Sequence, residues 1–153
     1  MSGWIDGKAA GMREQLIGTW KLVSATREEL PSGAKVDQLG AHPTGYLNYA
    51  PDGRMIAIIA RGDRAKPTWP HPTAAQAEAL FRSVLSYAGT YSVSGNEVTH
   101  HVDVSWNEAW TGTRQTRNFQ LDGDRLRLST PPSPDPLDGK MSVRTMVWER
   151  VKA

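Results

Sequence analysis

Short runs of alternating apolar and polar residues, separated by turn-forming residues, recur along most of this 153-residue chain. Successive side chains of a β-strand point to opposite faces, so such runs predict strands with one buried face. Three pairs of runs are joined by residues that tolerate positive φ, which predicts three hairpins. They are GYLNYAPDGRMIAIIAR, TYSVSGNEVTHHVDVSW and RQTRNFQLDGDRLRLST. The pattern therefore predicts an antiparallel, all-β fold.

Further strands are predicted on either side of these hairpins. GTWKLVSATREE near the start and KMSVRTMVWERV near the end both read as long strands, and a weak strand is expected around Lys35 and Val36. A closed barrel removes the exposed edges of a sheet, so we expect about eight or nine antiparallel strands in a closed barrel.

Two helices accompany the predicted strands. A short helix is expected over residues 10 to 17. In TAAQAEALFRSVL, Thr73 and Gln76 have the spacing of a capping box. Apolar residues then recur at helical spacing, at Ala77, Leu80, Phe81, Val84 and Leu85. This segment, about residues 73–85, predicts an amphipathic helix that packs on the sheet or closes a cavity.

Length and composition predict one domain and exclude several function classes. No repeat or domain boundary is visible, so we expect an N-terminal arm with a short helix over residues 1–15 and one barrel domain over 16–153. The net charge is only +2 and both signs are interleaved, which argues against nucleic-acid or membrane binding. The chain has no cysteine. It shows no signal-peptide pattern and no apolar run near the about 18 residues of a membrane span, so a cytoplasmic location is expected.

Four stretches carry a resemblance to a known family. LIGTWKLVSA, GYLNYAPDGRM, YAGTYSV and VSWNEAWTGTRQTRNFQLDGDRLRLST resemble the bacterial lipocalin-like domain family of small calycin-type barrels, from about Leu16 to Arg150. The resemblance implies a lipocalin-like barrel whose floor is closed by Trp20 stacked with Arg150. It implies little about activity, because a fold does not determine a function.

Strand alternation also predicts which side chains line the barrel. Val98, His100, Val102 and Val104 share one face of a strand. If this face meets those of the neighbouring strands, the lumen is apolar with a few polar groups, as small-ligand sites usually are. A small hydrophobic or amphipathic ligand with a carboxylate or carbonyl group would then contact Arg117, Gln115, Tyr87, Tyr91, Phe119 and Trp110. Trp69, Trp106 and Trp110 either form an aromatic rim or pack the loops down.

Two predicted lumen residues each have a functional and a structural interpretation. A buried guanidinium needs a partner, so Arg117 pairs either with a ligand carboxylate or enolate or with an internal acid, Asp103 or Glu149. His100 is either a general acid or base or a structural histidine held by hydrogen bonds against Tyr87 or Gln115. His101 and Asp103 are expected to form a surface pair.

Three function classes follow from this sequence. The first is a binding module for a small hydrophobic molecule. The second is a cofactor-independent isomerase, cyclase, lyase or hydratase, in which His100 transfers a proton and Arg117 stabilises an anion. The third is a structural or protein-interaction role that needs no cavity. No metal is expected, since His100 and His101 point apart on their strand. No cofactor is expected either. The protein is expected to be a monomer or a homodimer.

Overall fold

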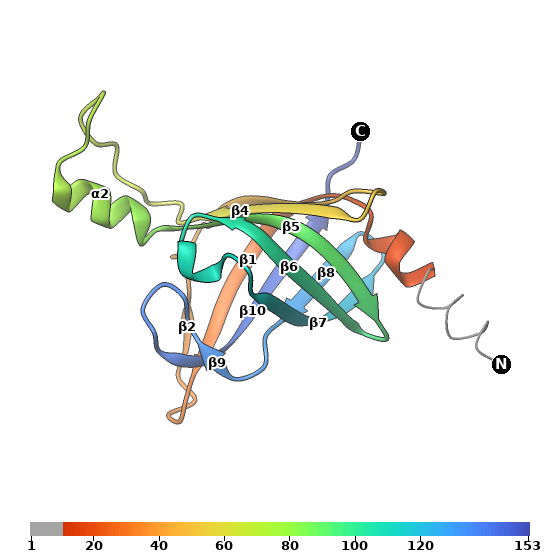
Figure 1. Cartoon of the computed structure of the whole chain (residues 1–153). Coiled ribbons are helices and arrows are strands. Elements are labelled where there is room, and N and C mark those ends of the chain that lie inside the picture. Colours follow the sequence, from red (N-terminus) through yellow and green to blue (C-terminus); the bar gives the residue numbers. More distant parts are fainter. Residues whose placement is uncertain (1–10) are drawn as a thin grey trace.

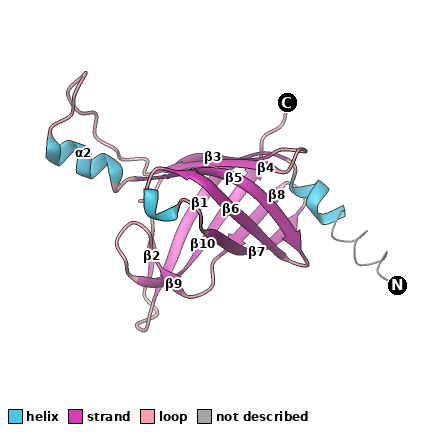
Figure 2. Cartoon of the chain, viewed as in Figure 1, coloured by secondary structure: helices cyan, strands magenta, loops and turns pink. Residues whose placement is uncertain are grey.

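Eight antiparallel strands close into a barrel in the computed structural model, which describes residues 11–153 (Figures 1 and 2). Strand β1 pairs with both β3 and β10, and this double pairing closes the sheet. Two short strands, β2 on β1 and β9 on β10, extend it. The ten strands are β1 (Gly18–Glu29), β2 (Lys35–Asp37), β3 (Thr44–Tyr49), β4 (Arg54–Ala60), β5 (Val84–Ser94), β6 (Glu97–Ser105), β7 (Arg114–Asp122), β8 (Arg125–Ser129), β9 (Ser133–Pro134) and β10 (Met141–Arg150). The predicted all-β closed barrel is confirmed.

The three predicted hairpins are present as β3–β4, β5–β6 and β7–β8. The turns of the last two contain Gly95 and Gly123, both with φ of 59°, a conformation that L side chains rarely adopt. The weak strand predicted around Lys35 and Val36 is β2. Turn chemistry and alternation together therefore determine the strand order of most of the barrel.

A bulge in β6 reverses the predicted orientation of Val104. The pairing of β5 with β6 runs from Ala88–Val104 to Gly89–Val102, so β6 has one extra residue there. The extra residue shifts the alternation by one, and Val104 is exposed while Val102 and His100 are buried. The backbones approach so closely that a β-carbon at Gly89 would overlap the carbonyl oxygen of His101. The prediction that Val104 faces the lumen is therefore wrong.

The amphipathic helix is shorter than predicted. Helix α2 spans Ala74–Phe81 and begins with the expected capping box at Thr73. Val84 and Leu85 belong instead to β5, where they pair with Ala60 and Ile59, because sheet pairing overrides a weak helical periodicity. None of the α2 residues is buried, and the helix projects away from the barrel (Figure 1). Of the two roles predicted for this helix, packing on the sheet is therefore not observed.

One end of the barrel is closed by the segment before β1. Residues 11–16 are helical, and the first ten residues of the arm predicted over residues 1–15 lie outside the described residues. The Trp20 indole nitrogen donates to the Leu16 carbonyl at 2.9 Å. The Arg150 guanidinium lies 4.2 Å from the Trp20 ring centroid and donates to the carbonyls of Ile17 and Gln15. Arg150 thus joins the last strand to the helix that covers this end.

Replacing Arg150 should destabilise the barrel substantially. Arg150→Ala removes a shielded cation–π contact and two charged hydrogen bonds, so we expect the free energy of unfolding to fall by about 2–4 kcal/mol. Urea denaturation measures this change. Arg125→Ala, at an exposed position of β8, is the matched control and should change stability by less than about 0.5 kcal/mol. Equal losses in the two variants would contradict the role of Arg150.

Candidate functional site

A cavity lies inside the barrel, away from the end that the N-terminal helix covers. Its lining includes Gln38 after β2, Trp110 of the short helix η1 (Glu108–Trp110), and Pro136 after β9. Those segments gather at the opposite end of the barrel in Figure 1. The space open to the centre of a water molecule is about 40 Å³, which exceeds the ~10–15 Å³ needed by one water. The cavity suits a small compact ligand rather than a long acyl chain.

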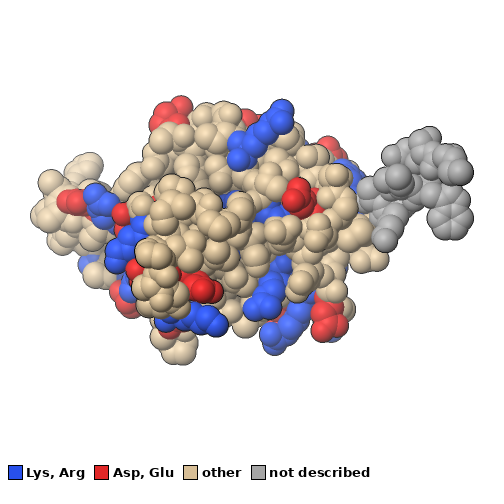
Figure 3. All heavy atoms as spheres, turned by 90° about the horizontal axis from the view of Figure 1, so that it is seen from below, with Lys and Arg blue, Asp and Glu red and all other residues tan. Residues whose placement is uncertain are grey.

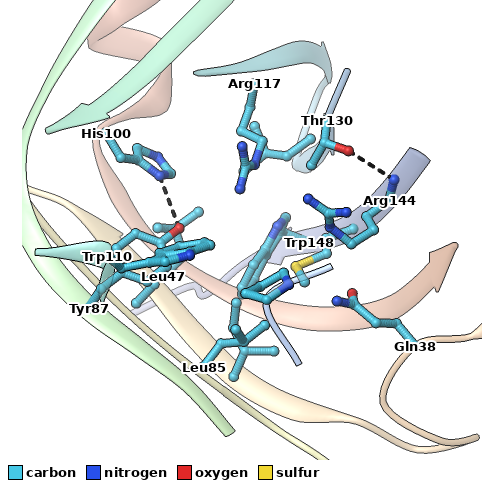
Figure 4. Close-up of a pocket in the computed structure, with 15 residues that line it drawn as sticks. Gln38, Leu47, Leu85, Tyr87, His100, Trp110, Arg117, Thr130, Arg144 and Trp148 are labelled. Atoms are coloured by element: carbon cyan, nitrogen blue, oxygen red, sulfur yellow. Dashed lines mark hydrogen bonds between the residues drawn. The ribbon is translucent and has the colours of Figure 1, made fainter. Parts of the chain in front are cut away.

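The cavity wall is mostly apolar, with six polar or charged residues. The apolar side chains come from strands around the barrel and include Leu47, Ala57, Ile59, Leu85, Leu128, Met146 and Trp148. The polar or charged members are Gln38, Tyr87, His100, Arg117, Thr130 and Arg144. Figure 4 shows Arg117 and Arg144 directed from different strands toward the same space. Among residues 11–153, two cations and no acidic residue therefore line this cavity.

His100 lies between two tyrosine hydroxyls on its buried face of β6. Its Nε2 is 2.6 Å from the Tyr49 hydroxyl and its Nδ1 is 3.0 Å from the Tyr87 hydroxyl. Burial, reinforced by the nearby charge of Arg117, lowers the pKa of His100 to about 3. A neutral imidazole has one donor and one acceptor nitrogen, so one tyrosine donates to the ring and the other accepts from it. His100 is therefore neutral around neutral pH, with both ring nitrogens occupied.

Arg117 has no acidic partner within residues 11–153. Its Nη1 donates to the Thr116 carbonyl at 3.1 Å, and no salt bridge forms. Asp103 pairs instead with Arg54 at 2.8 Å, and Glu149 is exposed on β10. Neither internal acid considered from the sequence compensates Arg117. Burial lowers the pKa of Arg117, which is the direction expected for a cation that the protein does not neutralise.

Arg144 is a second lumen arginine, and it was not among the site residues predicted from the sequence. Its side chain is buried and donates to the Ser133 carbonyl, the Ser133 hydroxyl and the Ser142 hydroxyl. Burial lowers the pKa of Arg144, and the charge of Asp135 opposes that shift. Asp135 itself accepts from Arg27 at 2.8 Å and from Gln38 at 3.1 Å. Arg144 is thus fixed by serine oxygens near a buried acid, whereas Arg117 is not.

Tyr49 and Arg144 could have been found by the same alternation argument that predicted the other lumen residues. Tyr49 shares a strand face with Leu47, and Arg144 shares one with Met146 and Trp148. Both faces are directed inward in the structure.

Aromatic side chains are stacked between the cavity and the base of α2. Trp110 meets Tyr87 edge-on, with ring centroids 5.3 Å apart, and meets Trp106 edge-on at 5.2 Å. Phe81 lies 6.5 Å from Trp106. Trp69 is 89% exposed, so it is not part of this cluster. Two of the three loop tryptophans therefore pack together beside the cavity, and Trp110 also lines it.

The cavity brings together four of the seven residues predicted for catalysis or ligand binding, namely His100, Arg117, Tyr87 and Trp110 (Figure 4). Gln115, Tyr91 and Phe119 do not line it. The Gln115 amide donates to the Thr113 hydroxyl, and the Tyr91 hydroxyl donates to the Ala50 carbonyl. Phe119 is buried in the apolar core. The surface pair expected between His101 and Asp103 is replaced by separate contacts of His101 with Ser92 and of Asp103 with Arg54.

Surface charge, potential metal ligands and helix length indicate few other kinds of binding site. On the face shown in Figure 3, basic and acidic side chains are scattered among uncharged residues rather than gathered into one basic area. Within the described part of the chain, no group of three or more histidine or acidic side chains could hold a metal ion. None of the helices in that part is long and apolar enough to cross a membrane.

Comparison with known proteins agrees with the barrel. Residues 17–151 match the lipocalin-like domain, so the chain belongs to this family. No curated protein matches it. A lipocalin-like protein from Bacteroides uniformis ATCC 8492 is 16% identical, with a TM-score of 0.49 over 89% of this chain and 98% of that one. An uncharacterized protein from Bacteroides eggerthii DSM 20697 is 15% identical, with a TM-score of 0.44 over 89% and 99%. The resemblance noted in the sequence is confirmed.

The lowered pKa of His100 predicts an acid-sensitive barrel. The folded pKa is about 3 against an ordinary value of 6.5, so between these pH values only the unfolded chain binds this proton. Stability due to His100 is complete above pH 6.5 and falls as the pH drops toward 3, by up to about 1.4 kcal/mol per pH unit. Denaturation at a series of pH values should give a shallower slope for His100→Gln than for wild type. Equal slopes would show that His100 does not titrate in this way.

Proposed function

We propose that the barrel binds a small, largely apolar molecule that carries a carboxylate or enolate group. The observation that supports this most strongly is Arg117, which lines the cavity and forms no salt bridge within residues 11–153. An unpaired, desolvated cation is costly, and a bound anion would remove that cost through charge-assisted hydrogen bonds. A guanidinium suits a planar, two-oxygen anion because its donors form a fixed fork.

The remaining lining groups support the same ligand. The Tyr87 hydroxyl lies on the cavity side of the His100 ring and offers a further polar contact. The Trp110 face and the surrounding aliphatic side chains suit an aromatic or compact aliphatic body. Arg144 and Gln38, near the buried Asp135, would contact polar substituents on the side away from His100. The ligand is thus a small amphipathic anion rather than a neutral lipid.

A cofactor-independent enzyme is the second candidate, favoured by the Tyr49–His100–Tyr87 chain. Both imidazole nitrogens are engaged by hydroxyls, so His100 would reach a ligand only through Tyr87. In an isomerase of this kind, Tyr87 would take a proton from the ligand while its own hydroxyl proton passes to His100, and Arg117 would stabilise the enolate that remains. The proton would then return through Tyr87 to a different atom of the ligand, which restores both side chains. Burial raises the pKa of Tyr87 and of Tyr49, which keeps both hydroxyls protonated at neutral pH.

The anion contact can be tested with benzoate and its neutral isostere benzamide. We expect wild type to bind benzoate more tightly than benzamide in calorimetry, and Arg117→Gln to weaken benzoate by about 10- to 100-fold while leaving benzamide nearly unchanged. The matched control is Arg114→Gln, on the same strand at an exposed position. Unchanged benzoate binding by folded Arg117→Gln would contradict the proposal.

Binding and catalysis are separated by following what happens to a retained compound. Wild type and His100→Gln are each incubated with a small-molecule extract of the native host and examined by chromatography and mass spectrometry. We expect both proteins to retain the same anionic compound without forming a new species, because the cavity acts as a binding site. Depletion by wild type alone, with turnover reduced by roughly 10²–10⁴ in the variant, would instead establish the enzyme.

A further inference from the structure

The segment between β4 and β5 forms an arm that touches its own barrel only near its base, where Phe81 lies beside Trp106. It includes α2, none of whose residues is buried, and it projects beyond the barrel end (Figures 1 and 2). Phe81 and Trp69 are both exposed. Isolated helices shorter than about 12–15 residues are marginal in water, and most helices depend on tertiary packing. Within the arm, Gln76 and Leu80 of α2 are half-buried beside residues 61–67, and the other residues of the helix are exposed.

A matching apolar surface lies on the outside of the barrel wall. We call it the outer patch; it consists of Tyr46, Ile56, Ile58, Ala88 and Val104, from four adjacent strands. Tyr46, Ile56, Ile58 and Val104 are 47%, 57%, 51% and 59% exposed. Tyr46 pairs with Ile58, and Ile56 with Ala88, which pairs in turn with Val104, so these side chains are contiguous. Contiguous exposed apolar surface of this kind usually marks an interaction site.

We propose that the arm of one copy covers the outer patch of a second copy in a two-fold symmetric dimer. The dimensions agree: an eight-residue helix is about 12 Å long, and four adjacent strands span about 14 Å. The arm extends away from its own barrel wall (Figure 1), so it leaves its own patch uncovered. Two copies related by a two-fold axis exchange equivalent contacts, and both patches are covered at once.

The arm and the outer patch are continuous on each copy, as an interface between identical surfaces requires. Phe81 at the end of α2 lies 6.5 Å from Trp106. Trp106 borders the same outer groove as Ile56 and Val104. The surface therefore runs without interruption from the barrel wall to the arm. This continuity favours a second copy of the chain over an unrelated partner, since one copy presents both halves of the contact.

Two ion pairs lie beside these surfaces and are formed within the chain. Arg54 binds Asp103 at 2.8 Å at the margin of the outer patch, and Arg82 binds Glu78 at 3.1 Å on α2. An apolar contact between arm and patch can therefore form with each of these ion pairs intact at its edge. These two pairs would therefore not bring an isolated charge into the contact.

The mass in solution tests the dimer directly. Light scattering after size exclusion, from low micromolar to submillimolar concentration, should give wild type twice the 16.8 kDa mass of one chain at the upper end. Ile56→Glu places a charge in the outer patch and should remain monomeric over the same range, with unchanged thermal stability. The control Val36→Glu, at an exposed apolar site on β2, should dimerise like wild type. A monomeric wild type, or a dimeric Ile56→Glu variant, would overturn the proposal.

Cross-linking identifies which surfaces meet, because the chain has no cysteine of its own. Copies with Ala77→Cys on α2 are mixed with differently tagged copies carrying Val104→Cys, and a short bismaleimide is added. We expect a cross-link between the two tagged species, and none when Val36→Cys replaces Val104→Cys. Failure of the Ala77→Cys and Val104→Cys copies to cross-link, while wild type is dimeric, would rule out this contact between arm and patch.

Discussion

Closure of the sheet between β1 and β10 is the constraint on which the other features depend. These strands are far apart in sequence, and their register places Trp20 opposite Arg150 and Leu22 opposite Trp148. The two tryptophans are buried side chains of the core. One lies at the end covered by residues 11–16, and the other forms part of the cavity wall. The pairing of β1 with β10 thus closes the floor and completes the core. On its other side β10 pairs with β8, which places Arg144 two strands from Arg117 on β7. Without the pairing of β1 with β10 the sheet would have two long exposed edges and no enclosed space.

Because of the bulge between β5 and β6, side chains of β6 contribute both to the cavity side and to the outer surface of the barrel. Up to Val102, the inward residues of β6 contribute to the core and cavity; after the extra residue, Val104 faces outward beside Ala88 and Ile56. Gly89 permits this because it has no side chain to collide with the opposite backbone. A regular strand would direct Val104 into the lumen and would leave a smaller apolar surface outside. The cavity boundary and the outer patch therefore have a common structural origin.

Local patterns in the sequence predicted the barrel well and the site only in part. Strand alternation and turn residues identify the hairpins, since these signals act over a few residues. The inward positions of His100, Arg117 and Tyr87 follow from the same alternation. The bulge that reverses Val104 depends on a close approach between backbones, which no spacing of side chains reveals. The end of α2 depends on Val84 and Leu85 pairing with β4, again a contact between distant residues. Likewise, the ion pair between Arg27 and Asp135 joins residues that are 108 positions apart in the sequence.

The lumen carries two cations rather than three because His100 is neutral. A protonated imidazole would add a third cation beside Arg117 and Arg144, in a space that no acidic residue of the described chain lines. Burial and Arg117 together prevent this, and the hydroxyls of Tyr49 and Tyr87 satisfy both nitrogens of the neutral ring. The same two hydroxyls remain protonated because burial raises their pKa values, so no internal anion replaces the missing acid. Within residues 11–153, Arg117 therefore has no acidic counter-ion. A structural arginine would be expected to have such a partner, which is the reason for proposing that Arg117 contacts a ligand.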